Sequence, residues 1–371
     1  MTSRERMLCA YQGGIPDRVP VYIRGVYPRM PGWIKKKHPS FKRLAEYVAE
    51  KADMQHTWSP RQGVFATGDE EISMDTRVIG MEGDWEIHET VVETPKGPLT
   101  SRTRVSTIGH PSLRAKCYVE NEEDLARYLS IPYTPETQDA SRFFEMDKAL
   151  GDAGVTMALF HCAVFDVWEL LGSELIAIWS ITNRSRIREL LDLFHERTYH
   201  RLETLLKAGV GPVIGLIGEE LATPPLLSPR DFAEFVGQYD KRLIDLAHRY
   251  GCIVRIHCHG NLSAVLDTFL DMGVDALHPV ETVPLGDITL EEFRRRVGNR
   301  IVVKGNIQVG DLYTCSKEEV VAACRETIRI AGKDGALILA PTASPYLPVL
   351  TDRVFENYGA MIDTALTYGT Y

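Results

Sequence analysis

The fold of this chain is constrained most by a regular alternation of short apolar runs and longer amphipathic segments that begins near residue 155. Each apolar run has the length of a strand, and in the segments between them apolar residues recur at helical spacing. The apolar runs are Val155 to Phe160, Pro212 to Ile217, Cys252 to Ile256, Ala276 to Val280, Arg300 to Val303 and Ala336 to Ala340. Continuous apolar strands that alternate with helices are typical of a parallel sheet covered on both faces.

Two further strands are predicted upstream, at Arg18 to Ile23 and at Met54 to Trp58, which brings the number of βα units to eight. Eight units favour an α/β fold of the closed (β/α)8 TIM-barrel type over an open sheet. The helices predicted between the later strands are Arg184 to Lys207, Pro229 to Tyr250, Ser263 to Met272, Lys317 to Ala331 and Asp352 to Tyr368. Ser228 before Pro229 and Ser316 before Glu319 are helix-start signals.

Between residues 70 and 118 the pattern changes to strand periodicity. Valine, threonine and charged residues alternate here, as in Trp85 to Val92, and Thr94-Pro95-Lys96-Gly97 is a turn signal. The pattern predicts an antiparallel β-meander inserted in the N-terminal third of the barrel. Because no linker rich in Pro, Gly or Ser interrupts the chain, residues 1–371 are predicted to form a single domain.

Charge and cysteine content argue against several classes of partner. The net charge is −9, and an acidic surface repels phosphate backbones and anionic lipid, so we expect neither nucleic acid nor membrane as a partner. No apolar run is long enough to span a bilayer, and the first residues lack the apolar core of a signal peptide. The seven cysteines are scattered without paired spacing, which suits reduced thiols and predicts a cytoplasmic protein.

Polar side chains follow the predicted strands at their carboxyl ends, where the active site of an α/β barrel lies. We expect them to converge on one rim, around a small-molecule substrate. The predicted catalytic residues are Glu219, Glu220 and His257. The predicted substrate contacts are Arg24, His161, Glu281, Asn306, Gln308 and Thr342.

The run His257-Cys258-His259 is the sharpest of these features. Alternate side chains of an extended strand share a face, so His257 and His259 are predicted to point the same way. Two imidazoles and a carboxylate from Glu219 or Glu220 would form a zinc environment with an open position. The other interpretation is that one histidine is a hydrogen-bonded structural group and the other a substrate contact.

The acidic pair and the arginine also have two interpretations each. A carboxyl group of Glu219 or Glu220 whose pKa is raised by burial could act as a metal ligand or general acid, and the alternative is an exposed charged loop. Arg24 could bind a carboxylate or phosphate, and the alternative is a surface ion pair. Asn306 follows Gly305, so a turn role competes with substrate orientation.

The C-terminal half resembles the uroporphyrinogen decarboxylase superfamily. The segments that carry the resemblance are Leu227 to Phe232, Ile256 to Asn261, Met272 to Asp275, Lys304 to Ile307 and Glu356 to Tyr358. The resemblance covers residues 150 to 371, with weaker support from Val19 to Arg24 and Thr94 to Gly97. It implies a (β/α)8 barrel, in agreement with the strand count.

The superfamily has two lines of activity, and the sequence departs from both patterns. True decarboxylases act on the acidic side chains of a tetrapyrrole and resemble one another in an Arg-rich segment after the first strand, where this chain has only Arg24 and Arg29. Zinc-dependent methyltransferases that work with corrinoid proteins carry a His-x-Cys motif and a later Cys. His257 matches that histidine, but residue 259 is His, and the loop Pro341 to Ser344 has no Cys. A site of His257, His259 and Glu219 or Glu220 would prefer oxygen ligands to a thiol.

The resemblance favours the methyltransferase branch. The predicted activity is methyl transfer from a small methylated substrate, such as a methoxylated compound, to a corrinoid on a partner protein, with zinc assisting. One alternative is a decarboxylase of a tetrapyrrole polyacid. Another is a non-catalytic barrel that binds a ligand or a corrinoid protein. A homodimer is a further expectation, because homodimers are common among such barrels.

Overall fold

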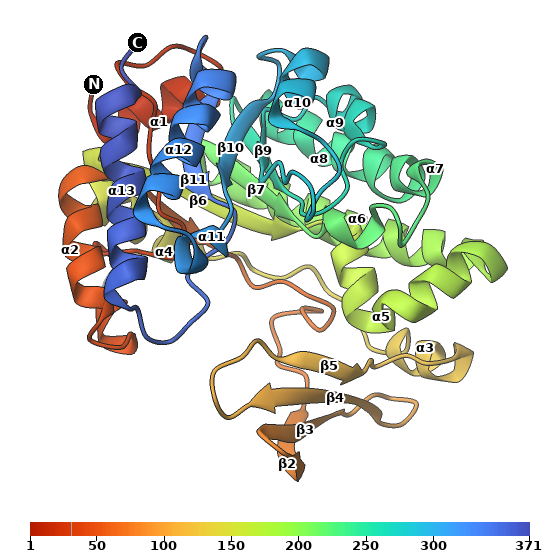
Figure 1. Ribbon diagram of the computed structural model, residues 1–371. Helices are drawn as coiled ribbons and strands as arrows, with labels where there is room; N and C mark the ends of the chain where they lie inside the picture. The colour runs from red at the N-terminus through yellow and green to blue at the C-terminus, as the bar shows by residue number, and fades with distance from the viewer. Residues whose placement is uncertain (31) are drawn as a thin grey trace.

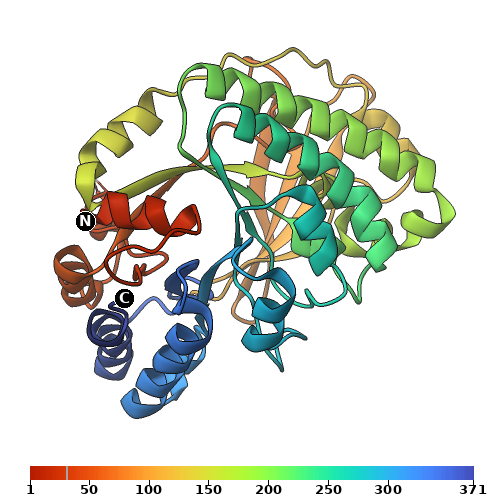
Figure 2. The same cartoon turned by 90° about the horizontal axis from the view of Figure 1, so that it is seen from above.

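The computed structural model describes residues 1–30 and 32–371 (Figure 1). Seven parallel strands form one sheet in the order β1-β6-β7-β8-β9-β10-β11. They are β1 Met54–Trp58, β6 Gly154–His161, β7 Val213–Ile217, β8 Ile253–His257, β9 Ala276–His278, β10 Val302–Ile307 and β11 Leu337–Pro341. The sheet curls, and seen from above the helices surround it (Figure 2).

The eighth predicted strand, Arg18 to Ile23, is not a regular strand, and that part of the prediction is wrong. Val21 makes a single parallel bridge to Leu339 of β11, with Tyr22 N donating to Leu339 O at 2.9 Å. On its other side, Asp53 N donates to Val21 O at 2.8 Å, just before β1 begins. A regular ladder does not form because Pro20 has no N–H to donate and the Val21 N–H goes to a side chain, Asp53 Oδ2, at 3.0 Å. The segment nevertheless links the two end strands of the curled sheet.

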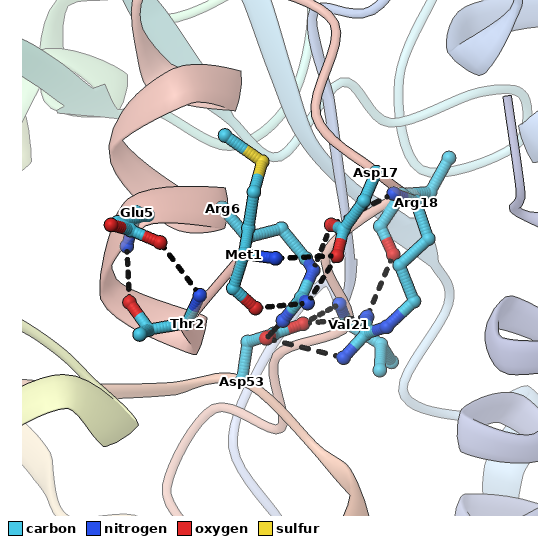
Figure 3. A network of polar contacts seen from close by, with 9 residues as sticks. Met1, Thr2, Glu5, Arg6, Asp17, Arg18, Val21 and Asp53 are labelled. Carbon is cyan, nitrogen blue, oxygen red and sulfur yellow. Dashed lines mark hydrogen bonds and ion pairs between the residues drawn. The ribbon is translucent and has the colours of Figure 1, made fainter.

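Asp53 organises this link (Figure 3). Its fully buried carboxylate accepts hydrogen bonds from Arg6 NH1 and Arg18 NH1, both at 2.8 Å, as well as from the Val21 N–H. Arg6 lies on the first helix, α1 (Ser3–Tyr11). One buried carboxylate therefore joins α1, the linking segment and the start of β1.

Helices cover the outer face of the sheet. The α-helices after α1 are α2 Phe41–Lys51, α3 Glu122–Tyr128, α4 Ser141–Leu150, α5 Ala163–Thr182, α6 Arg184–Lys207, α7 Pro229–Phe232, α8 Gln238–Arg249, α9 Leu266–Met272, α10 Leu290–Val297, α11 Asp311–Thr314, α12 Lys317–Thr327 and α13 Asp352–Tyr368. The predicted bounds of α6 and α13 are confirmed. The helix predicted over 229–250 is instead interrupted by a π-helical turn at Ala233–Gly237, with α7 before it and α8 after it. None of the described helices is long and apolar enough to cross a membrane.

The predicted antiparallel meander is confirmed as a separate four-stranded sheet in the order β2-β3-β4-β5. Its strands are β2 Met74–Glu82, β3 Trp85–Val92, β4 Leu99–Ser106 and β5 Leu113–Lys116. In Figure 1 it lies below the parallel sheet. Burial does not alternate along these strands: every residue of β2 is exposed, and most of β3 is half-buried.

The interior of the curled sheet is apolar at the amino ends of its strands. Met7, Ala10 and Tyr11 of α1 pack there against strand residues such as Ile253 and Val302. Side chains two residues further along the same strands face the same interior, one layer nearer to the carboxyl ends of the strands. On β8 and β10 these next residues are Arg255 and Lys304, so the lining changes from apolar to cationic towards the carboxyl ends of the strands.

Candidate active site

A cavity of about 180 Å³ lies at this level inside the sheet. Its lining includes Arg24, Arg255, His278 and Lys304, together with Met157 and Leu159 of β6. These residues come from strands far apart in the sequence and from the linking segment. The cavity is therefore a product of the curled sheet. Most of its strand residues lie within the strands, and of the predicted site residues only Arg24 lines it.

Two of the cations are held inside the sheet without an acidic partner. The Lys304 ammonium donates hydrogen bonds to Tyr11 Oη at 2.9 Å and to Gln55 Oε1 at 2.5 Å. Arg255 NH2 donates to the sulfur of Met157 at 3.1 Å, and its Nε has no hydrogen-bond partner. Burial lowers the pKa of both groups, and each is lowered further by the other cations around the cavity.

Arg24, which directly follows the linking segment, contacts two imidazoles, those of His257 and His278. Its NH1 lies 3.1 Å from His257 Nε2 and 3.3 Å from His278 Nδ1. His257 Nδ1 lies 2.9 Å from the carbonyl oxygen of His278, and His278 Nε2 lies 3.2 Å from that of Pro341. Carbonyl oxygens only accept, so these contacts place the hydrogen on His257 Nδ1 and on His278 Nε2. His278 Nδ1 can then accept from His257 Nδ1, at 2.9 Å, as well as from Arg24. Arg24 NH1 also lies 3.3 Å from His257 Nδ1, but with the hydrogen on Nδ1 only His257 Nε2 can accept from it.

Both imidazoles are neutral in this arrangement. Burial lowers the pKa of His257 and of His278 well below the usual value, and the charge of Arg24 lowers them further. Protonation of either imidazole would remove the lone pair that accepts from Arg24, so the contact with Arg24 favours the neutral rings. The pair therefore acts as an acceptor for cationic or N–H donors at neutral pH.

His257 and His259 lie side by side, as strand periodicity predicts, with ring centroids 4.7 Å apart. His259 Nδ1 is 3.2 Å from Glu281 Oε2, which also accepts from the Gly260 N–H at 3.0 Å. Burial acts to raise the pKa of Glu281, but the hydrogen bonds from His259 and Gly260 outweigh it and lower the pKa. His259 and Glu281 thus form a separate polar contact above His257.

The two adjacent glutamates have different surroundings. Burial raises the pKa of Glu220, and backbone hydrogen bonds, together with the nearby His259 and Arg24 side chains, oppose that rise. Glu219 is fully buried and instead faces Cys162 and Asp240 of α8. Burial raises the pKa of Glu219 well above the usual value and that of Asp240 to about 7.

The other predicted site residues mainly contact one another or the backbone. His161 Nδ1 lies 2.9 Å from Asp166 Oδ1, at the edge of α5. Asn306 Oδ1 accepts from the Val280 N–H at 3.1 Å. Thr342 donates to Gln308 Oε1 at 2.6 Å, and both side chains accept from the Val309 N–H. None of these four belongs to the lining of the cavity described above, and neither do Glu219, Glu220, His257, His259 or Glu281.

The arrangement around His257 does not fit a zinc ion. Its available nitrogen, Nε2, accepts from the Arg24 guanidinium, and a second cation at that position would be repelled. Among the described residues, the groups whose ligand atoms lie within 4.8 Å of one another are His161, Asp166 and Glu169, and Cys162, Glu219 and Asp240. Neither group contains His257 or His259. Zinc at these histidines stays a prediction, and no step of the chemistry below depends on it.

Of the eleven residues that line the cavity, only Arg24 was among the predicted site residues, and those not predicted include Arg255, Lys304 and His278. A signal for them exists in the sequence. Arg255 precedes His257 by two positions on a strand of otherwise apolar residues, so both side chains must face the same interior. A charged residue inside an apolar strand is costly to bury unless it has a function, and Lys304 carries the same signal.

Comparison with known proteins identifies the family. A family model described as uroporphyrinogen decarboxylase (URO-D) matches residues 153–368. The chain belongs to the uroporphyrinogen decarboxylase family. The predicted family is thereby confirmed, over the part of the chain that contains β6 to β11 and most of the residues described above.

Relatives within this family are distant. The chain is 24% identical over 346 residues to a uroporphyrinogen decarboxylase of Trichodesmium erythraeum (strain IMS101), covering 90% of this chain and 88% of that one. It is 25% identical over 365 residues to a uroporphyrinogen decarboxylase of Prochlorococcus marinus (strain MIT 9301), covering 95% and 96%. A solved structure of a methyltransferase from Methanosarcina mazei matches over 98% of both chains with a TM-score of 0.62 and 16% identity. That likeness concerns the fold.

Proposed function

We propose that this enzyme of the uroporphyrinogen decarboxylase family transfers a methyl group from a small methylated donor to a corrinoid carried by a partner protein. The observation that carries the proposal is the size of the cavity, about 180 Å³. Pockets for drug-sized ligands span roughly 300–1,000 Å³, and a tetrapyrrole polyacid is larger than such ligands. A small donor is the better match. The closed (β/α)8 barrel expected from the sequence would be completed by the linking segment at Val21.

The residues around the cavity suit the binding and orientation of such a donor. Met157 and Leu159 offer apolar contacts for a methyl group, and Arg24 and His278 offer polar contacts in the same cavity. Holding the donor in one orientation lowers the entropic cost of bringing the methyl carbon to its acceptor. The name of the methyltransferase from Methanosarcina mazei, which has this fold, agrees with the proposal.

Glu220 is the proposed proton donor. When the bond between the methyl carbon and the donor oxygen breaks, the oxygen keeps the bonding electron pair and needs a proton to leave as a hydroxyl group. Because burial raises the pKa of Glu220, a larger fraction of this carboxyl is protonated near neutral pH than in water. The corrinoid supplies the nucleophile that accepts the methyl group.

A decarboxylase is the second candidate, and two observations favour it. The relatives described above are named uroporphyrinogen decarboxylases. Arg24, Arg255 and Lys304 are cations that could bind the carboxylates of a polyacid. The third candidate, a barrel that only binds a ligand or a corrinoid protein, predicts no turnover of any kind.

Three assays on the purified protein distinguish these candidates. Methoxylated compounds are incubated with the protein and with cobalamin kept reduced by titanium(III) citrate, and methylation of the cobalt is followed by its absorption spectrum. Release of CO2 from uroporphyrinogen is measured in parallel, and ligand-dependent thermal shift detects binding without turnover. We expect methylation and no CO2 release. Decarboxylation without methylation would refute the proposal in favour of the second candidate, and binding alone would favour the third.

A further inference from the structure

We propose that Arg24, Arg255 and Lys304 form a carboxylate subsite, so that the methyl donor is a small methylated carboxylic acid. The subsite is the cationic side of the cavity already described, and the identity of its ligand as a methyl donor rests on the proposed function. Nothing in the size of the cavity alone predicts a charged ligand. The inference rests on the charges that line it.

The three cations converge from separate parts of the fold. Arg255 lies on β8 and Lys304 on β10, with β9 between them, and Arg24 follows the segment that joins β11 to β1. All three line the same cavity. Within residues 1–30 and 32–371, no carboxylate lies within 4.0 Å of the nitrogen atoms of these three side chains.

The hydrogen-bond donors of Arg255 lack oxygen partners. The side chain is only 6% exposed, its Nε has no partner, and NH2 faces the thioether of Met157, which is a weak acceptor. A buried guanidinium without acceptors is costly, because its hydration is lost and nothing replaces it. A carboxylate in the cavity would accept from these donors in the planar, two-pronged geometry that arginine prefers.

Lys304 contributes a positioned ammonium. Tyr11 Oη and Gln55 Oε1 each accept one of its hydrogens, and the Tyr11 hydroxyl donates to Gln55 Oε1 at 2.6 Å. An ammonium has three hydrogens, so one remains for a ligand. Burial and the nearby cations lower the pKa of Lys304, and an anion beside it would favour the charged form again.

The ligand is assigned as a carboxylate on grounds of both charge and space. The same cavity has to hold the anionic group and the methyl group, and its apolar wall at Met157 and Leu159 leaves room for a short organic skeleton. A carboxylate and a phosphate share the chemistry that these cations recognise. The experiment therefore includes inorganic phosphate as a separate ligand.

The test compares ligands of the same shape that differ in charge. Binding of methoxyacetate and of 3-methoxybenzoate is measured by calorimetry against methoxyacetamide and 3-methoxybenzamide, and inorganic phosphate is titrated separately. At least one carboxylate should bind roughly tenfold to a hundredfold more tightly than its amide, as expected for one or two charge-assisted hydrogen bonds. Equal affinity within both pairs, or tighter binding of phosphate than of either carboxylate, would overturn the assignment.

Two variants test whether the preference for a carboxylate over its amide arises from this subsite. Arg255→Met and Lys304→Met should each reduce the preference for the carboxylate over the amide by at least about tenfold. Arg242→Met is the matched control, because it removes a cation on the outer helix α8, where Arg242 pairs with Glu196. The control should keep the full preference, and a preference that survives in both cavity variants would contradict the proposal. If a cavity variant does not fold, the comparison of ligands on the wild-type protein still decides.

Methyl transfer is measured separately with the same ligands. A carboxylate that binds tightly but is not demethylated would refute the proposed function and leave the subsite intact. Demethylation of the neutral amides together with equal binding of both forms would refute the subsite and leave the proposed function intact.

Discussion

Replacement of Asp53 by Asn tests whether one buried carboxylate holds the two ends of the curled sheet together. Asp53 Oδ1 accepts from Arg6 NH1 and Arg18 NH2, at 2.8 and 3.2 Å, and Oδ2 accepts from Arg18 NH1 and the Val21 N–H, at 2.8 and 3.0 Å. An asparagine presents one oxygen and one NH2 group. In either orientation of the amide, its NH2 group would face two N–H donors.

The magnitude follows from this count. The variant loses a charge-assisted hydrogen bond, worth about 1.5–3 kcal/mol, and at least one further hydrogen bond, worth about 0.5–1.5 kcal/mol. It also leaves Arg18 without its countercharge, while Arg6 keeps Asp17, and breaking a buried ion pair costs about 3–5 kcal/mol in comparable cases. We therefore expect Asp53→Asn to lower the free energy of unfolding by about 3–5 kcal/mol, a large part of the ~5–15 kcal/mol typical of a folded domain.

The assay is urea-induced unfolding at pH 7, followed by circular dichroism, with thermal unfolding as a second measurement. Asp17→Asn is the matched control, because Asp17 also pairs with Arg6, at 2.6 Å, but its side chain is 42% exposed. Arg6 itself is buried, but water can replace part of the contact at the 42% exposed Asp17, so Asp17→Asn should destabilise the protein less than Asp53→Asn. A loss below about 1 kcal/mol for Asp53→Asn, or an equal loss in both variants, would refute the reasoning.

Three further predictions concern the ionisable groups of the site. Glu219 and Asp240 have raised pKa values, about 7 for Asp240, so the folded protein holds protons that unfolded carboxyls release. The contribution of these two groups to the free energy of unfolding is therefore complete below about pH 4 and is lost as the pH rises through 7. Glu219→Gln should therefore reduce the fall in melting temperature between pH 5 and 8, and an unchanged fall would argue against buried protons at this pair. Glu220→Gln should slow methyl transfer by roughly 10²–10⁴-fold, as for loss of a general acid, while donor affinity measured by calorimetry stays within a few-fold; an unaffected rate would remove Glu220 from its role. Arg24→Met should raise the pKa of His257, because the guanidinium charge helps to lower it, and an imidazole titration by NMR that does not shift would contradict the contact.

Strand periodicity predicts only part of the arrangement of the site. Alternation along β8 predicts that His257 and His259 lie next to each other, and their ring centroids are 4.7 Å apart. The catalytic and substrate-binding roles of the polar residues after the apolar runs stay predictions, and of these residues only Arg24 lines the cavity. The same periodicity applied to Arg255 and Lys304 would have added them to the site. Arg255 lies within the predicted strand Cys252 to Ile256 and not after it, whereas Lys304 directly follows the predicted strand Arg300 to Val303 and was given no role.

Other features depend on contacts that no local pattern encodes. Glu219 and Glu220 are adjacent in sequence, and which of them faces the histidines depends on the turn after β7 and on the position of Asp240 in α8. The contact between Arg24 and His257 spans 233 residues and exists only because the linking segment completes the curl of the sheet.

The sequence by itself therefore determined the α/β class, the meander, the family and the side of each strand that faces inward, because these follow from periodicity and from short motifs. The tertiary structure decided which inward-facing groups meet. It brought Arg24 between two imidazoles and left Arg255 and Lys304 without an acidic partner in the described chain. Electrostatic energies depend on distances between side chains across the closed sheet, and those distances are set only when distant segments pack together.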